Sequence, residues 1–315
     1  MDKTREAALG KEKIGTTLKG IGPCYEDKAA RLDLRMGDLR DPVYLRDRLE
    51  HALALKNKEL AAYGAKTFTV DEILEPLLEQ AKKIVPHLTD TSVYLYKAYK
   101  AGKKILFEGA QGSMLCLTHG TYPYVTSSSP LATAIPLNTG LPLDAVNDIM
   151  GIMKAYTTRV GAGPFPTELL DETGNTIREK GHEYGTVTKR PRRVGWLDLA
   201  ELGYVVRISG VKHVSLMLLD VLGGLKEIKV CTGYLMDGKP IDYMPAGVNE
   251  YENVKPVYKT LPSWQEDISG IRNYDDLPEA AKNYVSFIEK HLGVEVDLIS
   301  VGPDKDATIV RKEIF

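Results

Sequence analysis

Five short segments rich in apolar residues occur along the chain, and several of them show no alternation of polar and apolar positions. They span Lys104–Glu108, Ile149–Arg159, Val214–Leu222, Ile228–Tyr234 and Val296–Val301. Strands of this kind are buried on both faces, as happens when helices cover both sides of a mostly parallel sheet. The pattern therefore predicts an α/β fold with a mixed, mainly parallel central sheet flanked by helices.

Helical stretches lie between these strands. Apolar residues recur at helical spacing over 44–62, over 70–101, where two helices flank Pro86, and over 277–292. Pro278 fits the first turn of the last helix, and Gly293 fits its end. Because the sequence shows no repeat and no long polar linker, we expect a single domain over 1–315 with a helical subregion over 43–101.

Composition and charge exclude several classes of protein. The 41 basic and 43 acidic residues give a net charge of −2, which argues against extended contact with nucleic acid. No run of about 18 apolar residues exists, so no membrane span is expected. Cys24, Cys116 and Cys231 are too far apart for a disulfide framework or a zinc site. The chain is therefore predicted to be cytoplasmic.

Four of the segments that follow predicted strands carry glycine or aspartate. They are GAQG at 109–112, GAGPFP at 161–166, LDVLGG at 219–224 and SVGPDKD at 300–306. In α/β sheets, ligands bind beyond the carboxyl ends of the strands. The sequence therefore predicts a binding edge built from these loops.

The segment 14–31 is a candidate phosphate loop. The hydroxyls of Thr16 and Thr17, followed by Gly20, offer side-chain and backbone donors to an anion. Arg31 lies on the helix expected to follow, one turn beyond Lys28 and on the same face. The alternative is a glycine loop that only leads into an ordinary helix.

A second candidate segment covers residues 107–129. Gln111 offers a planar amide that is able to read a purine edge. Thr126 and the serines at 127–129 supply hydroxyls of the kind that hold phosphate. His119 is either an acid–base group or a structural histidine, and the structural role is favoured.

A third candidate is the basic segment 186–196. Its arginines suit bidentate binding of carboxylate or phosphate, and Gly185 and Gly195 bracket it as hinges of a substrate loop would. The alternatives are a nuclear-import-like run, a nucleic-acid patch or a solvated loop, and the net charge argues against an extended polyanion. The basic residues are Lys189, Arg190, Arg192 and Arg193.

Asp220 lies at the end of the strand predicted over Val214–Leu222, and its carboxylate is able to accept two N–H bonds from guanine. The alternative is a carboxylate that caps the next turn. The sequence alone leaves both open.

Together these segments resemble the adenylosuccinate synthetase family from about Lys11 to the end of the chain. The matching motifs, in order, are IGTT, GIGP, YEDKAAR, FEGAQG, HGTYPYVTSS, RVGAGPFPTEL, RPRRVGWLDL, LDVL and VGPDKDATI. The resemblance implies a fold related to P-loop-type nucleotide-binding folds. It also implies a ligase of purine biosynthesis, in which GTP phosphorylates the 6-oxygen of IMP and the amine of aspartate displaces the phosphate, with Mg²⁺ required.

The same resemblance implies residue roles. Thr17 and Gln111 would contact IMP, and Thr126 its 5′-phosphate. Arg31 would reach the IMP phosphate of a neighbouring subunit, which implies a homodimer. The aspartate carboxylate would bind Thr188 and Arg190, and the GTP site would comprise Arg192, Asp220 and the backbone near Ser300 and Gly302.

The family also has features that this sequence lacks. It begins with a phosphate loop that carries a catalytic Asp, followed by a catalytic His and a magnesium-binding glycine, and no such segment occurs here. No catalytic residue and no metal ligand are therefore assigned, and we expect missing strands in the sheet and little turnover by this chain alone. The alternative is a non-catalytic IMP-binding, nucleotide-binding or oligomerisation module.

Smaller departures fall inside the matching motifs. Leu18 and Lys19 stand where the family usually has Gly and Arg. Val187 and Lys189 replace a Thr and a Gly, and Leu218 stands where a Lys stacks on guanine.

Overall fold

A computed structural model of the chain describes residues 1–10, 15–185 and 189–313. The chain divides into two compact units. Unit 1 comprises Met1–Glu108, Val125–Ser129 and Leu137–Pro142. Unit 2 comprises Gly109–Tyr124, Pro130–Pro136 and Leu143–Phe315.

Unit 1 is helical. Its main helices are α1 (Asp2–Ala8), α2 (Ile21–Ala30), α3 (Pro42–Ala62), α4 (Val70–Ile84) and α5 (Thr91–Lys100), with short 3₁₀ turns η2 (Met36–Arg40) and η3 (Val85–His87). Pro42 opens α3 while Asp41 accepts from the amides of Val43 and Tyr44. Thr69 and Glu72 cap α4 reciprocally. The helix predicted over 44–62 and the pair flanking Pro86 are thus confirmed.

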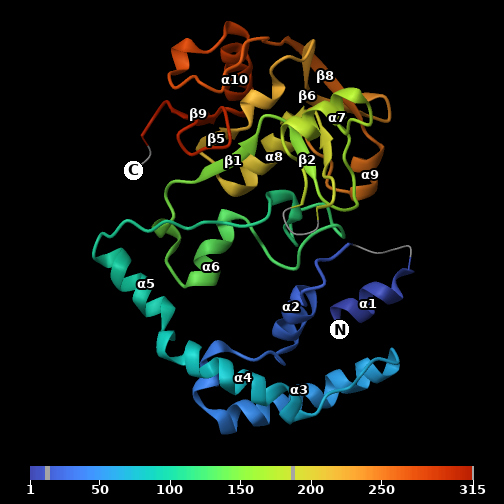
Figure 1. Ribbon diagram of the computed structural model, residues 1–315, viewed down its shortest axis with the longest axis vertical. Coiled ribbons are helices and arrows are strands. Elements are labelled where there is room, and N and C mark those ends of the chain that lie inside the picture. The colour runs from blue at the N-terminus through green and yellow to red at the C-terminus, as the bar shows by residue number, and fades with distance from the viewer. Residues whose placement is uncertain (11–14, 186–188, 314–315) are drawn as a thin grey trace. The chain divides into compact units, whose positions relative to one another are not determined.

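The core of unit 1 is small. Helices α3 and α4 pack side by side (Figure 1) and bury Leu45, Leu49 and Leu74. The strand predicted over 104–108 is wrong, because that segment forms no strand. Apolar content alone does not make a strand, and unit 1 holds no strand among its described residues that could pair with it.

The central sheet lies in unit 2. Strands β1 (Met150–Lys154), β5 (His213–Met217) and β9 (Glu295–Ser300) run parallel, and β10 (Thr308–Val310) pairs antiparallel with β9. Their order is β1-β5-β9-β10, which confirms the mixed, mainly parallel sheet. The single strand predicted over 149–159 is instead two strands. Its second part, β2 (Thr157–Arg159), pairs with β3 (Arg193–Gly195) in a separate ribbon.

A second sheet is built around β6 (Glu227–Met236), which overlaps the strand predicted over 228–234. Its partners are β4 (Leu197–Asp198), β7 (Lys239–Ile241) and β8 (Lys255–Pro262). The remaining helices are α6 (Ile135–Thr139), α7 (Glu172–Lys180), α8 (Leu199–Ser209), α9 (Val248–Asn253) and α10 (Glu279–Leu292). Short 3₁₀ turns are η4 (Ser113–Leu115), η5 (Ala132–Ala134), η6 (Leu143–Ala145), η7 (Leu219–Leu222) and η8 (Tyr274–Asp276).

One large apolar core joins the central sheet to α8 and α10. Helix α10 buries Ala281, Tyr284 and Ile288, and the Tyr284 hydroxyl donates to the Ala155 carbonyl at 2.6 Å. Pro278 precedes α10, and Gly293 ends it with a φ of +67°, a conformation that glycine adopts without strain. Among the described residues, no helix has the length and apolar character needed to cross a membrane.

Candidate functional site

The carboxyl ends of β1, β5 and β9, here called the carboxyl edge, carry two of the predicted loops. Lys154 pairs in register with Met217, and Leu216 pairs with Ile299, so the three strands end together. The turn η7, which contains Asp220, follows β5 and contacts β9. The loops 219–224 and 300–306 therefore meet at one edge, as the sequence predicts.

Asp220 has an unsatisfied side chain at this edge. Its Oδ1 is buried and has no hydrogen-bond partner within the part of the chain that the structure describes. Burial raises the pKa of the Asp220 carboxyl, and the charge of Asp267 adds to this effect while Lys180 opposes it. The turn η7 begins after Leu218, which forms no side-chain cap hydrogen bond. An exogenous donor would satisfy this oxygen.

A second unsatisfied polar atom lies next to η7. Trp264 Nε1 is buried without an acceptor among the described residues. A Cβ on Gly223 would lie 3.0 Å from this nitrogen, so glycine is what lets η7 approach the indole. The ammonium of Lys180 donates to the Gly223 carbonyl at 2.6 Å and anchors the same turn.

Ser300 and Gly302 shape the neighbouring loop. The Ser300 hydroxyl donates to the Gly302 carbonyl at 2.9 Å, and both residues are buried. A Cβ on Gly302 would lie 3.1 Å from the Cβ of Ala307, which leaves little room for a side chain there. The Ser300 hydroxyl is thus used within the loop.

Sequence reasoning missed a buried carboxylate beside this edge. Glu183 accepts from Lys154 Nζ at 2.6 Å, from the Tyr156 hydroxyl at 2.7 Å and from Arg192 Nη1 at 2.7 Å. Burial alone would raise the pKa of Glu183, but these three hydrogen bonds outweigh it and lower the pKa. The cluster ties Arg192 to the end of β1. Only the position of Glu183 directly before the basic segment would have hinted at it.

Burial, aided by the charge of Arg192, lowers the pKa of Lys154 in the same cluster. Two basic side chains share the single carboxylate of Glu183, so basic groups are in excess at this end of β1. An excess of basic groups favours anionic ligands.

Backbone hydrogen bonds connect Gly185 with Lys189 and Arg190. Gly185 N–H donates to the Arg190 carbonyl, and Lys189 N–H donates to the Gly185 carbonyl, both at 2.8 Å. Arg190 is exposed beside residues 186–188. Thr188, the other residue expected to bind aspartate, lies outside the described residues.

Two of the four basic residues, Arg192 and Arg193, are paired with carboxylates of the chain itself. Arg192 is bound to Glu183, and Arg193 donates to both oxygens of Glu168 at 2.7 and 2.5 Å and to the Gly163 carbonyl. Internal pairing of these two arginines disfavours a nucleic-acid patch. The hinge expected at Gly195 is wrong, because this residue is buried in β3, where a Cβ would lie 2.4 Å from the Thr167 carbonyl oxygen.

Gln111 takes a different setting from the one expected. It is exposed with a φ of +66°, and the segment before it is not a strand. The predicted loop of residues 161–166 contacts an arginine, since Arg159 donates to the Ala162 carbonyl at 2.9 Å.

Three predicted IMP contacts fall in unit 1. Thr17 is exposed on the loop of residues 15–20. Thr126 precedes Ser127, whose Oγ would lie 3.5 Å from a Cβ on Gly22 in α2. Arg31 does not share a helix face with Lys28 as predicted, because it lies beyond the end of α2 with a φ of +64°.

The sequence analysis assigns no metal ligand to this chain, and the structure brings together a group of side chains of a metal-binding kind. Among the described residues, the group of three side chains able to hold a metal ion is His213, Glu295 and Asp297. His213 and Glu295 pair at the amino ends of β5 and β9, opposite the carboxyl edge. The described residues of the carboxyl edge therefore do not fit a magnesium site by themselves.

Comparisons with known proteins agree on one family. A family model described as adenylosuccinate synthetase matches residues 1–309. Adenylosuccinate synthetase of Thermoanaerobacter sp. (strain X514) is 48% identical over 313 residues, which is 99% of this chain and 74% of that protein. The Streptococcus gordonii enzyme is 48% identical over 316 residues, which is 100% of this chain and 74% of that protein. The structure of fully ligated adenylosuccinate synthetase from Plasmodium falciparum has a TM-score of 0.93 at 38% identity, covering 99% of this chain and 74% of that one.

Proposed function

The chain belongs to the adenylosuccinate synthetase family, and we propose that its own residues hold the three substrates of this ligase: IMP, aspartate and GTP. The family joins aspartate to IMP in purine biosynthesis and uses GTP and Mg²⁺. Relatives that match nearly the whole chain are named as the enzyme, so the ligase is favoured over a non-catalytic module.

The GTP site rests on one observation, the unpartnered Oδ1 of Asp220 at the carboxyl edge. A guanine presents two adjacent N–H groups, and a carboxylate accepts both. These bonds stabilise the ionised form and so offset the burial that raises the pKa of Asp220. The backbone of Ser300 and Gly302 lines the same edge, and Arg192 reaches the nucleotide with N–H groups not used on Glu183.

The remaining roles follow the family motifs. Arg190, which is exposed, binds the aspartate carboxylate together with Thr188. Thr17 and Thr126 supply hydroxyls to IMP and its phosphate, and Gln111 supplies an amide. Arg31 serves the IMP phosphate of a second copy in a homodimer. Because the described residues do not form a magnesium site, none is assigned to that ion. Three free cysteines suit a reducing cytoplasm.

Calorimetric titration of wild type and of Asp220→Asn with GTP tests the proposed guanine site. We expect about a 100-fold weaker Kd, because two hydrogen bonds to a charged acceptor are lost or inverted. Wild type prefers GTP to ATP, since adenine presents an acceptor where guanine has its ring N–H, and the variant loses this preference.

Asp237→Asn is the matched control, since Asp237 is an exposed carboxylate between β6 and β7. Its GTP affinity stays at the wild-type value. Equal GTP affinity in Asp220→Asn and wild type would remove Asp220 from the site. Formation of adenylosuccinate from IMP, aspartate, GTP and Mg²⁺ gives the activity readout for the same variants.

A further inference from the structure

Helix α1 directs two carboxylates at the loop of residues 15–20. Glu6 Oε1 accepts from the amides of Gly15 at 2.6 Å and Thr16 at 3.4 Å. Asp2 accepts from the Thr16 hydroxyl at 3.0 Å and from the Gly20 amide at 2.8 Å. Two of the donors that the sequence offers to an anion, the Thr16 hydroxyl and the Gly20 amide, are therefore already bound to Asp2.

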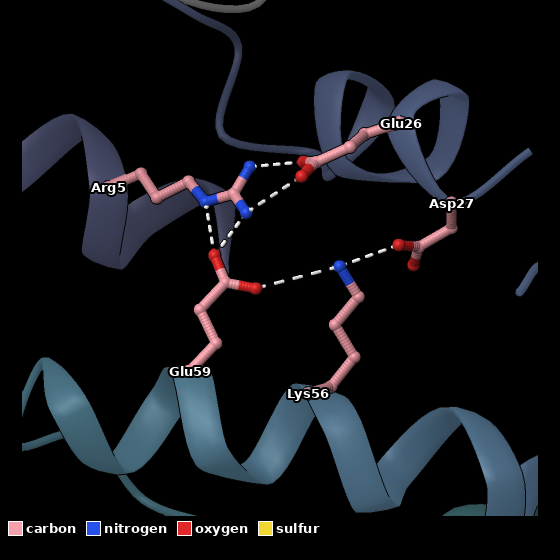
Figure 2. A network of polar contacts seen from close by, with 5 residues as sticks. All are labelled: Arg5, Glu26, Asp27, Lys56 and Glu59. Atoms are coloured by element: carbon pink, nitrogen blue, oxygen red, sulfur yellow. Dashed lines mark hydrogen bonds and ion pairs between the residues drawn. The ribbon is translucent and has the colours of Figure 1, made fainter. Parts of the chain in front are cut away.

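The same helix is fixed in place by Arg5. Figure 2 shows the Arg5 guanidinium between Glu26 of α2 and Glu59 of α3. Lys56 extends the network, with its ammonium 2.6 Å from Asp27 Oδ1 and 3.6 Å from Glu59 Oε2. One side chain of α1 thus ties it to two helices of unit 1, while two others hold the loop.

Two interpretations of these carboxylates predict opposite changes in IMP affinity when the carboxylates are removed. As internal competitors, Asp2 and Glu6 would occupy amides that an IMP phosphate needs, and their removal would strengthen binding. As supports, they would hold the loop so that its remaining groups meet the nucleotide, and their removal would weaken binding.

The geometry favours support. Glu6 is only 8% exposed, and its helix is anchored by Arg5, so an incoming phosphate would have to displace a buried and tethered group. Bonds at Gly15, Thr16 and Gly20 fix the loop on both sides of Thr17, whose side chain stays exposed. Leu18 N–H also donates to the Thr16 hydroxyl at 3.3 Å, which tightens the turn at Thr17.

We propose that Asp2 and Glu6 are positioning residues for IMP, which pin the loop of residues 15–20 from both ends so that Thr17 faces the nucleotide. This inference rests on the proposed role of Thr17 in IMP binding. It also assigns the amides of Gly15, Thr16 and Gly20 to the carboxylates of α1, so IMP meets the Thr17 hydroxyl instead of these amides.

Calorimetric titration with IMP and, separately, with GTP tests the proposal on Asp2→Asn and Glu6→Gln. An amide has one acceptor oxygen and no charge, so each variant keeps part of the contact and weakens the pinning. We expect the Kd for IMP to rise about 10-fold in each single variant and about 100-fold in the double variant, since each loses hydrogen bonds to a charged group. The Kd for GTP stays unchanged, a split that general unfolding would not produce.

Two further variants serve as control and rescue. Lys3→Ala changes an exposed residue of the same helix and leaves the Kd for IMP unchanged. Asp2→Glu keeps both acceptor oxygens and returns the Kd to within about threefold of wild type. If Asp2→Asn or Glu6→Gln fails to fold, Thr16→Val leaves both carboxylates but removes one donor to Asp2 and the acceptor of Leu18 N–H, and it weakens IMP binding about threefold.

The outcomes separate the two proposals. A wild-type protein that does not bind IMP contradicts the proposed function of Thr17 and its partners. A wild-type protein that binds IMP, with unchanged affinity in Asp2→Asn and Glu6→Gln, overturns only the positioning role. Tighter IMP binding in these variants also overturns it and identifies the carboxylates as competitors.

Discussion

The two units are stabilised by different means. Unit 2 has a large apolar core that includes both tryptophans, Trp196 and Trp264, and a second, smaller cluster around Tyr234 and Tyr251. Unit 1 buries a cluster centred on Leu45, Leu49 and Leu74, and it relies on caps and on ion pairs such as those of Arg5. The predicted substrate residues of unit 1 therefore lie on a scaffold with little apolar burial, whereas Asp220 and Ser300 of unit 2 lie at the edge of a packed sheet.

The charged side chains of the two units also differ in how exposed they are to water. In unit 2, Glu183 is 1% exposed and is shared by Lys154 and Arg192. The hydrogen bonds in these contacts offset the cost of removing the carboxylate from water. In unit 1, the side chains of Arg5, Glu26 and Glu59 are 29%, 48% and 29% exposed. Water and salt therefore weaken the ion pairs of unit 1 much more than those of unit 2.

The largest expected effect comes from truncating the two cores. Leu216 in β5 and Leu45 in α3 are both fully buried. Because the cost of a cavity depends on how far its walls relax, we expect Leu216→Ala to lose about 4 kcal/mol and Leu45→Ala about 2 kcal/mol. Urea unfolding measures both, with tryptophan fluorescence reporting unit 2 and far-UV circular dichroism reporting the helices of both units.

The two probes also separate the units. Leu45→Ala shifts the circular dichroism transition more than the fluorescence transition, because the tryptophans lie in unit 2. An equal shift of both probes, or equal losses for the two substitutions, would show that the units share one cooperative core.

The second largest effect is expected at Glu183. Glu183→Gln leaves Lys154 and Arg192 without their counter-charge, and we expect a loss of about 3 kcal/mol at neutral pH. Glu172→Gln, an exposed residue at the start of α7, is the control and changes stability by less than about 0.5 kcal/mol. A loss as small as that of the control would mean that the cluster is dispensable.

The pH dependence of this contribution has a definite sign. The pKa of Glu183 is lowered in the folded protein, so its stabilisation is fully present above about pH 4.5, its ordinary value, and is lost as pH falls through the lower folded pKa. The difference in unfolding free energy between wild type and Glu183→Gln stays constant from pH 7 to 5 and shrinks below that range. Growth of the difference on acidification contradicts the assignment.

How far the sequence predicts this molecule depends on the range of the interactions. Helices set by local spacing and end residues, such as α3 and α10, were predicted within two residues. The split of 149–159 into β1 and β2 was missed because β2 pairs with β3, about forty residues later in the chain.

The candidate site shows the same limit. Asp220 and Ser300 were recognisable because each follows an apolar strand, and the register of β5 and β9 brings those ends together. The buried cluster of Glu183 is not predictable from local sequence, since its partners Lys154 and Tyr156 lie in a strand and loop about thirty residues earlier. Whether an arginine binds a ligand or an internal carboxylate is likewise a tertiary property, as Arg193 and Glu168 show.

A smaller effect is expected from the Arg5 network of unit 1. Arg5→Met keeps the length of the side chain and removes its ion pairs, and we expect a loss of about 1 kcal/mol because the partners are half-exposed. Sodium chloride at high concentration lowers the circular dichroism transition of wild type towards that of the variant and leaves the Glu183 contribution in place. Equal salt sensitivity at Arg5 and Glu183 would contradict the contrast between the units.

The smallest expected effect uses one strained residue from each unit. Leu18 has a φ of +57° and Lys189 a φ of +52°, and both stand where the family usually has glycine. A left-handed backbone costs a residue with a Cβ about 1–2 kcal/mol. Glycine avoids this strain but loses more chain entropy on folding, which offsets part of the gain. We therefore expect Leu18→Gly and Lys189→Gly each to stabilise the protein by about 0.5 kcal/mol. Leu18→Ala and Lys189→Ala keep the Cβ and give no gain. Thermal melts measure all four, and because unit 1 has the smaller core, Leu18→Gly raises its transition by more than Lys189→Gly raises that of unit 2. A gain in the alanine variants would trace the effect to lost side-chain contacts instead of backbone strain.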